Sequence, residues 1–280
     1  MKQSNQAHHY LKMQTHHLPV PYYASKMRRV RVLLPRGYEA EKHATYPVVY
    51  MHDGQNIFYS KESFSGYSWK IIPTLKNHLA LPKMIIVGID NAGEKRIDEY
   101  GPWPATTDEL TDIPMTVGGD GMAYGRWLVE TVKPFIDGHY RTKSDRSHTL
   151  LAGSSMGGII TAYMGSAYPE VFGHLGVFSL ASWISEAPFL AYTEKHLLDP
   201  ATKVYIQVGT NEGDAADKPF IKGQMNQQYI DSTLAYYQTL LRTGHPLDQV
   251  KLRITADAIH HEKHWADHFV EFLYVSLKEN

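Results

Sequence analysis

Short apolar runs rich in β-branched residues recur along almost the whole chain and constrain its fold more than any other feature of the sequence. Each run is bounded by glycine, proline or other turn residues, which is typical of strands that are buried on both faces. Such strands belong to a sheet that is covered by helices. The sequence predicts strands at residues 30–35, 48–51, 84–89, 149–152, 175–180, 204–208 and 250–254.

Stretches with helical spacing lie between these runs. Residues 157–167 are small and apolar all round, which indicates a buried helix, whereas residues 225–241 and 263–277 are amphipathic. Residues 124–136 also show a helical pattern, with Pro134 as its weak point. Strands that alternate with helices predict an α/β fold with a mainly parallel central sheet and helices on both faces.

No repeat, low-complexity tract or linker divides the chain. We therefore expect a single domain over residues 1–280, in which residues 1–27 form an N-terminal extension. Residues 57–69 and 91–121 connect predicted elements and are long enough to be functional loops.

Composition excludes several classes of function. The 280 residues carry 28 Lys and Arg against 29 Asp and Glu, a net charge of −1, which argues against nucleic acid as a partner. Because the chain has no cysteine, a disulfide framework and a cysteine nucleophile are excluded. It shows no signal-peptide pattern and no run of the ~18 apolar residues that a membrane span needs, so we expect a cytoplasmic protein. The 16 histidines direct attention to catalysis or metal binding.

The clearest chemical signal is the sequence GSSMGG at residues 153–158. It follows a predicted strand and opens a predicted helix, which is the context of the G-x-S-x-G nucleophile elbow. The central serine of that motif occupies a strained turn whose flanking positions have room only for glycine. The helix N-terminus behind it offers N–H groups to an oxyanion. We therefore predict that Ser155, and not Ser154, is a catalytic nucleophile.

This motif and VVYMHDGQNIF at residues 48–58 together resemble the Putative esterase family of the α/β-hydrolases, which includes enterochelin-esterase-like, feruloyl-esterase-like and esterase D-like enzymes. The resemblance continues in the family's order through RVLLPRGYEA, IIVGIDNAGEKRIDEY, VKPFIDGHYRT, YPEVFG, VGTNEGD and HHEKHW. It covers nearly the whole chain from about residue 28 onward. The resemblance implies an α/β-hydrolase fold and a serine hydrolase that cleaves carboxylic esters without a cofactor.

A serine that accepts an acyl group needs hydrogen-bond donors aimed at the tetrahedral oxygen, and loss of one donor slows such reactions about 100- to 1000-fold. In the α/β-hydrolase fold one donor is the backbone N–H after the nucleophile, here that of Met156. For the other, the resemblance implies the N–H of Gln55, with Gly54 as the alternative. We expect the side chains of His52 and Asp53 to hold this loop by hydrogen bonds.

The general base of an α/β-hydrolase follows both the serine and the acid in the chain. Four histidines lie near the C-terminus: His260, His261, His264 and His268. The family segment reads approximately H-x-E-x-x-W, so the positions of Glu262 and Trp265 imply His260 as the base and leave His261 as the alternative. His264 and His268 fall within the predicted helix.

The acid of the triad is expected just after the strand at 204–208. Glu212 stands there, where feruloyl-esterase-like relatives carry an Asp, so the resemblance implies Glu212 as the acid. Asp214 and Asp217 are alternatives on the same loop, and a Ser-His pair without an acid, as in some siderophore-esterase relatives, is a third. The acid would fix the histidine tautomer and stabilise the imidazolium without taking the proton.

A metal-dependent hydrolase that uses the C-terminal histidines is one alternative function. In the zinc-protease pattern H-E-x-x-H read from His261, the second ligand falls on Trp265, so the spacing predicts no catalytic metal. The sequence GGDG at residues 118–121 lacks the spacing of a dinucleotide or phosphate loop, so no such cofactor is expected. A non-catalytic binding protein that retains the hydrolase fold is the other alternative.

The interpretation that accounts for most of these residues is a serine carboxylic-ester hydrolase that forms an acyl-enzyme with a small-molecule ester. Short-chain acyl, feruloyl and siderophore-type esters all fit the sequence. Tyr67, Trp69, Trp103 and Trp183 are candidates for a substrate pocket, although aromatic residues are more often part of the core. Arg96 is a candidate for either an anionic substrate group or a structural ion pair.

Overall fold

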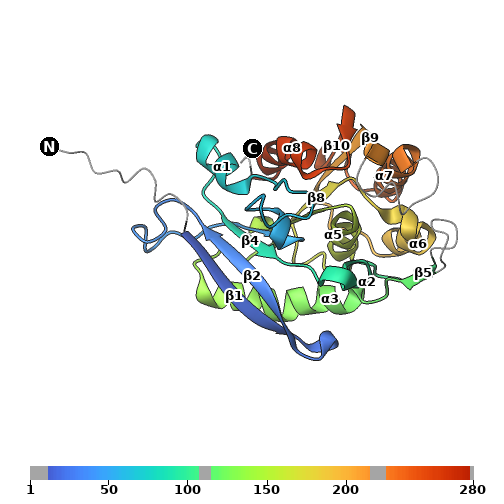
Figure 1. The fold of residues 1–280 in the computed structure, drawn as a ribbon. Coiled ribbons are helices and arrows are strands. Elements are labelled where there is room, and N and C mark those ends of the chain that lie inside the picture. Colours follow the sequence, from blue (N-terminus) through green and yellow to red (C-terminus); the bar gives the residue numbers. More distant parts are fainter. Residues whose placement is uncertain (1–11, 107–114, 215–224, 278–280) are drawn as a thin grey trace.

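The computed structural model describes residues 12–106, 115–214 and 225–277, and its centre is an eight-stranded sheet. The strand order is β1-β2-β4-β3-β7-β8-β9-β10 (Figure 1). Every neighbouring pair from β4 to β10 is parallel, whereas β1–β2 and β2–β4 are antiparallel, which confirms a mainly parallel sheet. The strands of this sheet are β1 (Lys12–Val20), β2 (Lys26–Leu34), β3 (Val48–Met51), β4 (Ile85–Ile89), β7 (Thr149–Ser154), β8 (His174–Phe178), β9 (Lys203–Asn211) and β10 (Val250–Ile259).

The helices follow the sequence pattern where that pattern is strong. The structure has helices at α1 (Ile71–Asn77), α2 (Arg96–Tyr100), α3 (Gly121–Trp127), α4 (Lys133–His139), α5 (Met156–Ala167), α6 (Glu186–Lys195), α7 (Met225–Arg242) and α8 (Glu262–Leu277). Of these, α5, α7 and α8 were predicted within a residue or two at each end. The predicted helix at 124–136 is continuous helical structure in which a π-helical turn, Leu128–Val132, joins α3 to α4 just before Pro134. The irregularity therefore falls beside the residue that lacks an N–H group to donate.

Each central strand contributes to two hydrophobic cores, because successive side chains of a strand point to opposite faces. In β3, Val48 and Tyr50 pack in one core, and Val49 and Met51 pack in the other. Helices α3 to α7 supply side chains to the first core, and α1 and α8 supply them to the second. The sheet therefore has helices on both faces, as predicted. Within the described ranges, no helix combines the length and the apolar character needed to cross a bilayer.

Several elements were not predicted. The segment at 91–121 is not a loop throughout, because it contains α2 and a two-stranded ribbon of β5 (Ala105–Thr106) and β6 (Thr116–Val117). Helices α1 and α6 were also missed. Strand β1 lies inside the segment that we assigned to an N-terminal extension, and it pairs with β2 along its whole length, from Lys12 opposite Leu34 to Val20 opposite Lys26.

Strand β1 escaped prediction because it forms an edge of the sheet and has few apolar residues. Only Leu18 and Val20 of its nine residues are buried. An edge strand with one exposed side needs no continuous apolar run, so hydrophobic periodicity does not distinguish it from a polar tail.

A buried ion pair joins the β1–β2 hairpin to α2. Arg28 donates two hydrogen bonds of 2.8 Å to the two carboxylate oxygens of Glu99. The hydroxyl of Tyr22, in the hairpin connection, donates a third bond of 2.7 Å to the same carboxylate. The Glu99 side chain is fully buried, so its charge depends on these donors for stabilisation.

We predict that Glu99→Gln lowers the free energy of unfolding by about 3 kcal/mol, because Arg28 would be left as a buried charge without a counter-ion. Urea denaturation followed by circular dichroism measures the change. The matched control is Glu39→Gln, which removes the exposed Lys12–Glu39 pair and should leave the midpoint unchanged. Equal, small effects of both substitutions would contradict the anchoring role of Glu99.

Candidate active site

Ser155 lies at the sharp turn between β7 and α5, with φ 59° and ψ −123°. A positive φ is strained for a residue that has a side chain, so neighbouring groups must hold it in place. Its N–H donates to the carbonyl of Phe178 at 2.9 Å, and its carbonyl accepts from the N–H of Gly158 at 2.9 Å. A Cβ added to Gly153 would lie 2.5 Å from the carbonyl oxygen of Gly157, so only glycine fits there. The turn thus has the strain and the crowding expected of a nucleophile elbow.

The turn after β3 lies beside the turn of Ser155, because β3 and β7 are paired with Met51 opposite Ala152. The N–H of His52 extends this ladder by donating to the carbonyl of Ala152 at 3.1 Å. Both turns therefore leave the sheet at its carboxyl edge, where ligand sites of parallel sheets lie.

The two backbone N–H groups predicted for the oxyanion belong to these neighbouring turns. Gln55 lies in the 3₁₀ turn Gly54–Asn56 that follows β3, and Met156 is the first residue of α5. A Cβ on Gly54 would lie 2.7 Å from the backbone of Gly88, so this glycine is required by the close approach of the turn to β4. The first N–H groups of a helix have no partner within the helix, which makes that of Met156 a donor for an anion.

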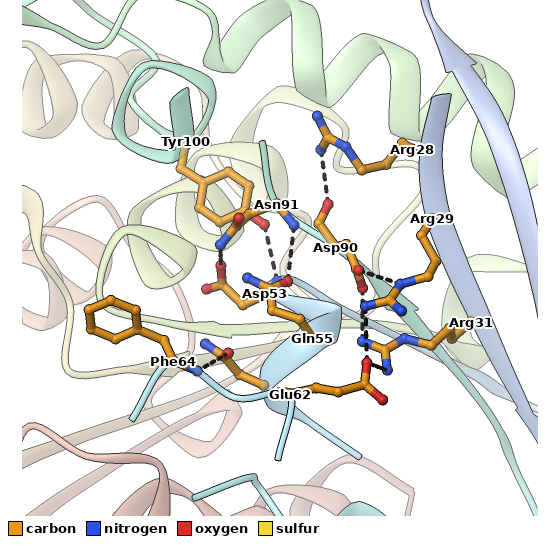
Figure 2. Close-up of polar contacts among 11 residues, drawn as sticks. Arg28, Arg29, Arg31, Asp53, Gln55, Glu62, Phe64, Asp90, Asn91 and Tyr100 are labelled. Carbon is orange, nitrogen blue, oxygen red and sulfur yellow. Dashed lines mark hydrogen bonds and ion pairs between the residues drawn. The ribbon is translucent and has the colours of Figure 1, made fainter. Parts of the chain in front are cut away.

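Asp53 is the charged anchor of the turn after β3 (Figure 2). Its carboxylate accepts two bonds of 2.8 Å from Arg96 and one of 2.6 Å from Nδ2 of Asn91. Its N–H donates to the hydroxyl of Tyr100 at 3.0 Å. Burial raises the pKa of Asp53, but the Arg96 charge and the hydrogen bonds outweigh it and bring the pKa below its ordinary value. Of the two roles that we considered for Arg96, the structure shows the ion pair.

His52 is buried beneath the same turn. Its Nδ1 lies 2.8 Å from the hydroxyl of Tyr124, and only 2% of the residue is exposed. Burial disfavours the imidazolium and lowers the pKa of His52 to about 3. His52 is therefore neutral at physiological pH and holds the loop, as we expected from the sequence.

His260 and Glu212 form a hydrogen-bonded pair at the same edge of the sheet. Nδ1 of His260 lies 2.7 Å from Oε2 of Glu212, and both side chains are almost completely buried. The pairing of β9 with β10 ends with Ile259 opposite Asn211. His260 and Glu212 are the residues that follow these two partners. An irregularity in β10 between Thr255 and Ile259 shifts the register, and this shift brings His260 level with Glu212.

Glu212 makes further hydrogen bonds besides the one to His260. Oε1 of Glu212 accepts from the N–H of Gly209 and from the hydroxyl of Ser179, each at 2.6 Å. The oxygen of Ser179 also accepts the indole N–H of Trp265 at 2.8 Å. A carboxylate can only accept hydrogen bonds, so with Glu212 as a carboxylate Nδ1 of neutral His260 carries the proton and Nε2 carries the lone pair.

The alternatives for the base and the acid lie elsewhere or outside the described residues. The ring of His261 packs against Tyr67, with ring centroids 5.7 Å apart. His264 and His268 lie on α8, and burial lowers the pKa of both. Asp217 and the side chain of Asp214 lie outside the described residues.

Tyr229 of α7 is a neighbour of His260 that the sequence analysis missed. Its hydroxyl lies 3.4 Å from Nε2 of His260, and the two ring centroids are 4.5 Å apart. Trp183 packs edge-on against the Tyr229 ring, with centroids 5.8 Å apart. An amphipathic helix pattern identifies Tyr229 as inward-facing but does not show which side chain it meets.

The remaining aromatic candidates divide between core and site. Trp69 is buried and packs edge-on against Phe178 with ring centroids 4.9 Å apart, so it belongs to the core. Trp103 packs with Tyr163 on α5, at 5.7 Å. Tyr67 and Trp183 lie next to His261 and Tyr229 respectively, near the candidate site.

Among the residues that the structure describes, no three His, Asp or Glu side chains are grouped so that they could hold a metal ion.

The mainly parallel sheet with helices on both faces has the α/β-hydrolase fold. The Putative esterase family matches residues 23–274, and the chain belongs to this family. It is therefore a carboxylic-ester hydrolase.

Relatives extend the comparison. The chain is 28% identical to the uncharacterised protein YbbA of Bacillus subtilis over 253 residues, which cover 88% of this chain and 92% of YbbA. A ferulic acid esterase of Anaeromyces mucronatus, solved with ferulic acid, has the same fold with TM-score 0.66 and 23% identity and aligns with 99% of this chain and 94% of its own. An IroE-like serine hydrolase of Shewanella oneidensis matches with TM-score 0.71 and 18% identity over 95% of this chain and 79% of its own.

We predict that His52 makes the protein sensitive to mild acid. Because its pKa is lowered to about 3 in the folded state, the unfolded chain binds one more proton between pH 6.5 and pH 3, and stability falls as the pH falls. Between pH 6.5 and pH 5 this lowers the free energy of unfolding of the wild type by about 2 kcal/mol. In His52→Gln this part of the loss should be absent. Urea denaturation at both pH values provides the measurement. His43→Gln, at an exposed histidine, should retain the wild-type pH dependence.

Proposed function

We propose that this esterase acts through Ser155 as nucleophile, His260 as general base and Glu212 as the acid that orients it. The observation that best supports this proposal is the 2.7 Å hydrogen bond between Glu212 and Nδ1 of His260. This bond leaves the lone pair on Nε2. Ser155 lies in its strained turn at the same edge of the sheet. A base with this tautomer is what a serine hydroxyl needs in order to lose its proton.

The proposed reaction has two halves. Ser155 Oγ attacks the ester carbonyl while His260 Nε2 takes its proton, and the N–H groups of Met156 and Gln55 bind the negative oxygen. His260 then gives the proton to the departing alcohol, which leaves an acyl-enzyme. Water attacks this acyl group with His260 again as base, and the carboxylic acid and free Ser155 are released. No step uses a cofactor.

The proposed substrates are small-molecule esters. The feruloyl class is supported by the relative crystallised with ferulic acid, and the siderophore class by an enterobactin esterase of Shigella flexneri solved with a dihydroxybenzoyl-glycine. Short-chain acyl esters remain the third class. An ester panel that spans all three classes ranks them by kcat/KM.

We predict that Ser155→Ala lowers kcat for every ester in the panel by about 10⁴-fold or more, because the acyl-enzyme cannot form. Labelling with a fluorophosphonate should modify the wild type at Ser155 and leave the variant unmodified. Ser154→Ala, which changes the adjacent buried serine, is the matched control and should still be labelled. An active, unlabelled wild type would point to another nucleophile, and an inactive, unlabelled one to a binding protein.

We predict that Glu212→Gln lowers kcat by about 10²- to 10⁴-fold, because an amide cannot accept hydrogen bonds from all three present donors and His260 loses its tautomer. Asp214→Asn, two residues away, should change kcat less than about threefold. Steady-state kinetics of both variants decides between them. A large loss for Asp214→Asn alone would transfer the acid role to that residue.

A further inference from the structure

Phe64 is the most exposed large apolar side chain in the described part of the chain, with 84% of the residue accessible to water. It belongs to the loop at 57–69, which directly follows the 3₁₀ turn that contains Gln55. Single exposed apolar residues are common on protein surfaces and need no explanation of their own. The position and the anchoring of Phe64 distinguish it from the others.

The backbone of Phe64 is held from the oxyanion side of the candidate site. Its N–H donates to the side-chain oxygen of Asn56 at 3.1 Å, and Asn56 is the neighbour of Gln55 (Figure 2). Two residues earlier, Glu62 accepts hydrogen bonds from Arg29 at 3.0 Å and from Arg31 at 3.1 Å. Figure 2 shows the ring of Phe64 directed away from this ion-pair cluster.

The residues after Phe64 are held from the histidine side of the site. The hydroxyl of Ser65 donates to Glu262, which lies two residues after His260. The ring of Tyr67 packs against His261, and the hydroxyl of Ser63 closes the loop by donating to the carbonyl of Tyr67 at 2.7 Å. The loop thus bridges the segments that carry Gln55 and His260.

A loop with its polar groups paired at both ends presents Phe64 at a defined place. Ordering such a loop costs conformational entropy, and the exposed ring returns no burial energy in the free protein. A partner that covers the ring gains the burial energy without a further ordering cost, because the loop is already fixed. The loop that carries the ring is hydrogen-bonded to the segment of the proposed oxyanion donor and to the segment of the proposed base, so the partner present in each turnover is the ester itself.

We propose that Phe64 is a specificity-determining residue that packs against an apolar group of the ester, either aliphatic or aromatic. This inference rests on the proposed serine-esterase function. The apolar group can belong to the acyl part or to the alcohol part, because the loop contacts both the Gln55 side and the His260 side.

Two ester series test the proposal and separate the two sources of the apolar group. The first consists of methyl esters of acetic, butanoic, octanoic and 3-phenylpropanoic acids. The second consists of acetates of methanol, butanol, octanol and 2-phenylethanol. Acid release at constant pH gives kcat/KM for each ester. We expect wild-type kcat/KM to rise with apolar size in one series, and Phe64→Ala to reduce the ratio of the largest to the smallest ester about tenfold in that series.

Two further variants sharpen the result. Phe64→Leu keeps apolar surface but removes the ring, so it should recover most of the ratio for octyl groups and less for phenyl groups. Leu79→Ala is the matched control, since Leu79 is also exposed, at 68%, but lies before β4 at the opposite end of that strand from the site. In Leu79→Ala, the ratio of kcat/KM for the largest ester to kcat/KM for the smallest should equal that of the wild type.

The outcomes separate the failure of this inference from the failure of the proposed function. If the wild type and Phe64→Ala share the same size dependence while Ser155 is labelled by a fluorophosphonate, Phe64 does not determine specificity and the proposed function stands. A flat wild-type series with labelled Ser155 overturns the inference in the same way. If no ester is cleaved and Ser155 is not labelled, the proposed function fails and this inference fails with it.

Discussion

The pairing of β3 with β7 at the centre of the sheet is the interaction on which the candidate site depends. Met51 lies opposite Ala152, and the bond from the N–H of His52 to the Ala152 carbonyl carries the ladder into the turns. The turns that contain Gln55 and Ser155 therefore leave the sheet side by side. A one-residue slip would send every side chain of β3 to the other face, where the two cores do not match it. The register that packs the core is thus the register that places the proposed oxyanion donors.

At the other half of the candidate site, β9 and β10 end on the pair Asn211 and Ile259, after an irregularity in β10 has shifted their register. At this edge of the sheet, the surroundings of each titratable side chain decide whether it is charged. Asp53 keeps its charge because Arg96 and Asn91 bind it, whereas the adjacent His52 loses its charge to burial. A fixed anion and a neutral imidazole beneath one turn hold that turn without placing a mobile proton next to the proposed nucleophile.

The features that could be predicted from the sequence are those with local causes. Strand β3 is a continuous apolar run, and the turn at Ser155 is bounded by glycines that its crowding requires. Features with distant causes could not be predicted. The role of Arg96 stayed open because its partner Asp53 lies 43 residues earlier, and the contact of Tyr229 with His260 depends on how α7 packs against the end of β9. Strand β1 can be identified only from its pairing with the edge of β2, which the sequence of β1 does not show.

The length of the Glu212 side chain follows from the backbone that carries it. A 3₁₀ turn, Glu212–Asp214, begins directly at the end of β9, so the carboxylate must reach back to the N–H of Gly209 as well as across to His260. An aspartate at this backbone position would have a side chain one methylene shorter for the same two contacts. Because Ser179 also binds Glu212 and in turn accepts the indole N–H of Trp265, the orientation of His260 is linked to the packing of α8 against the sheet. The core of this protein thereby sets the direction of the ring that the proposed reaction uses.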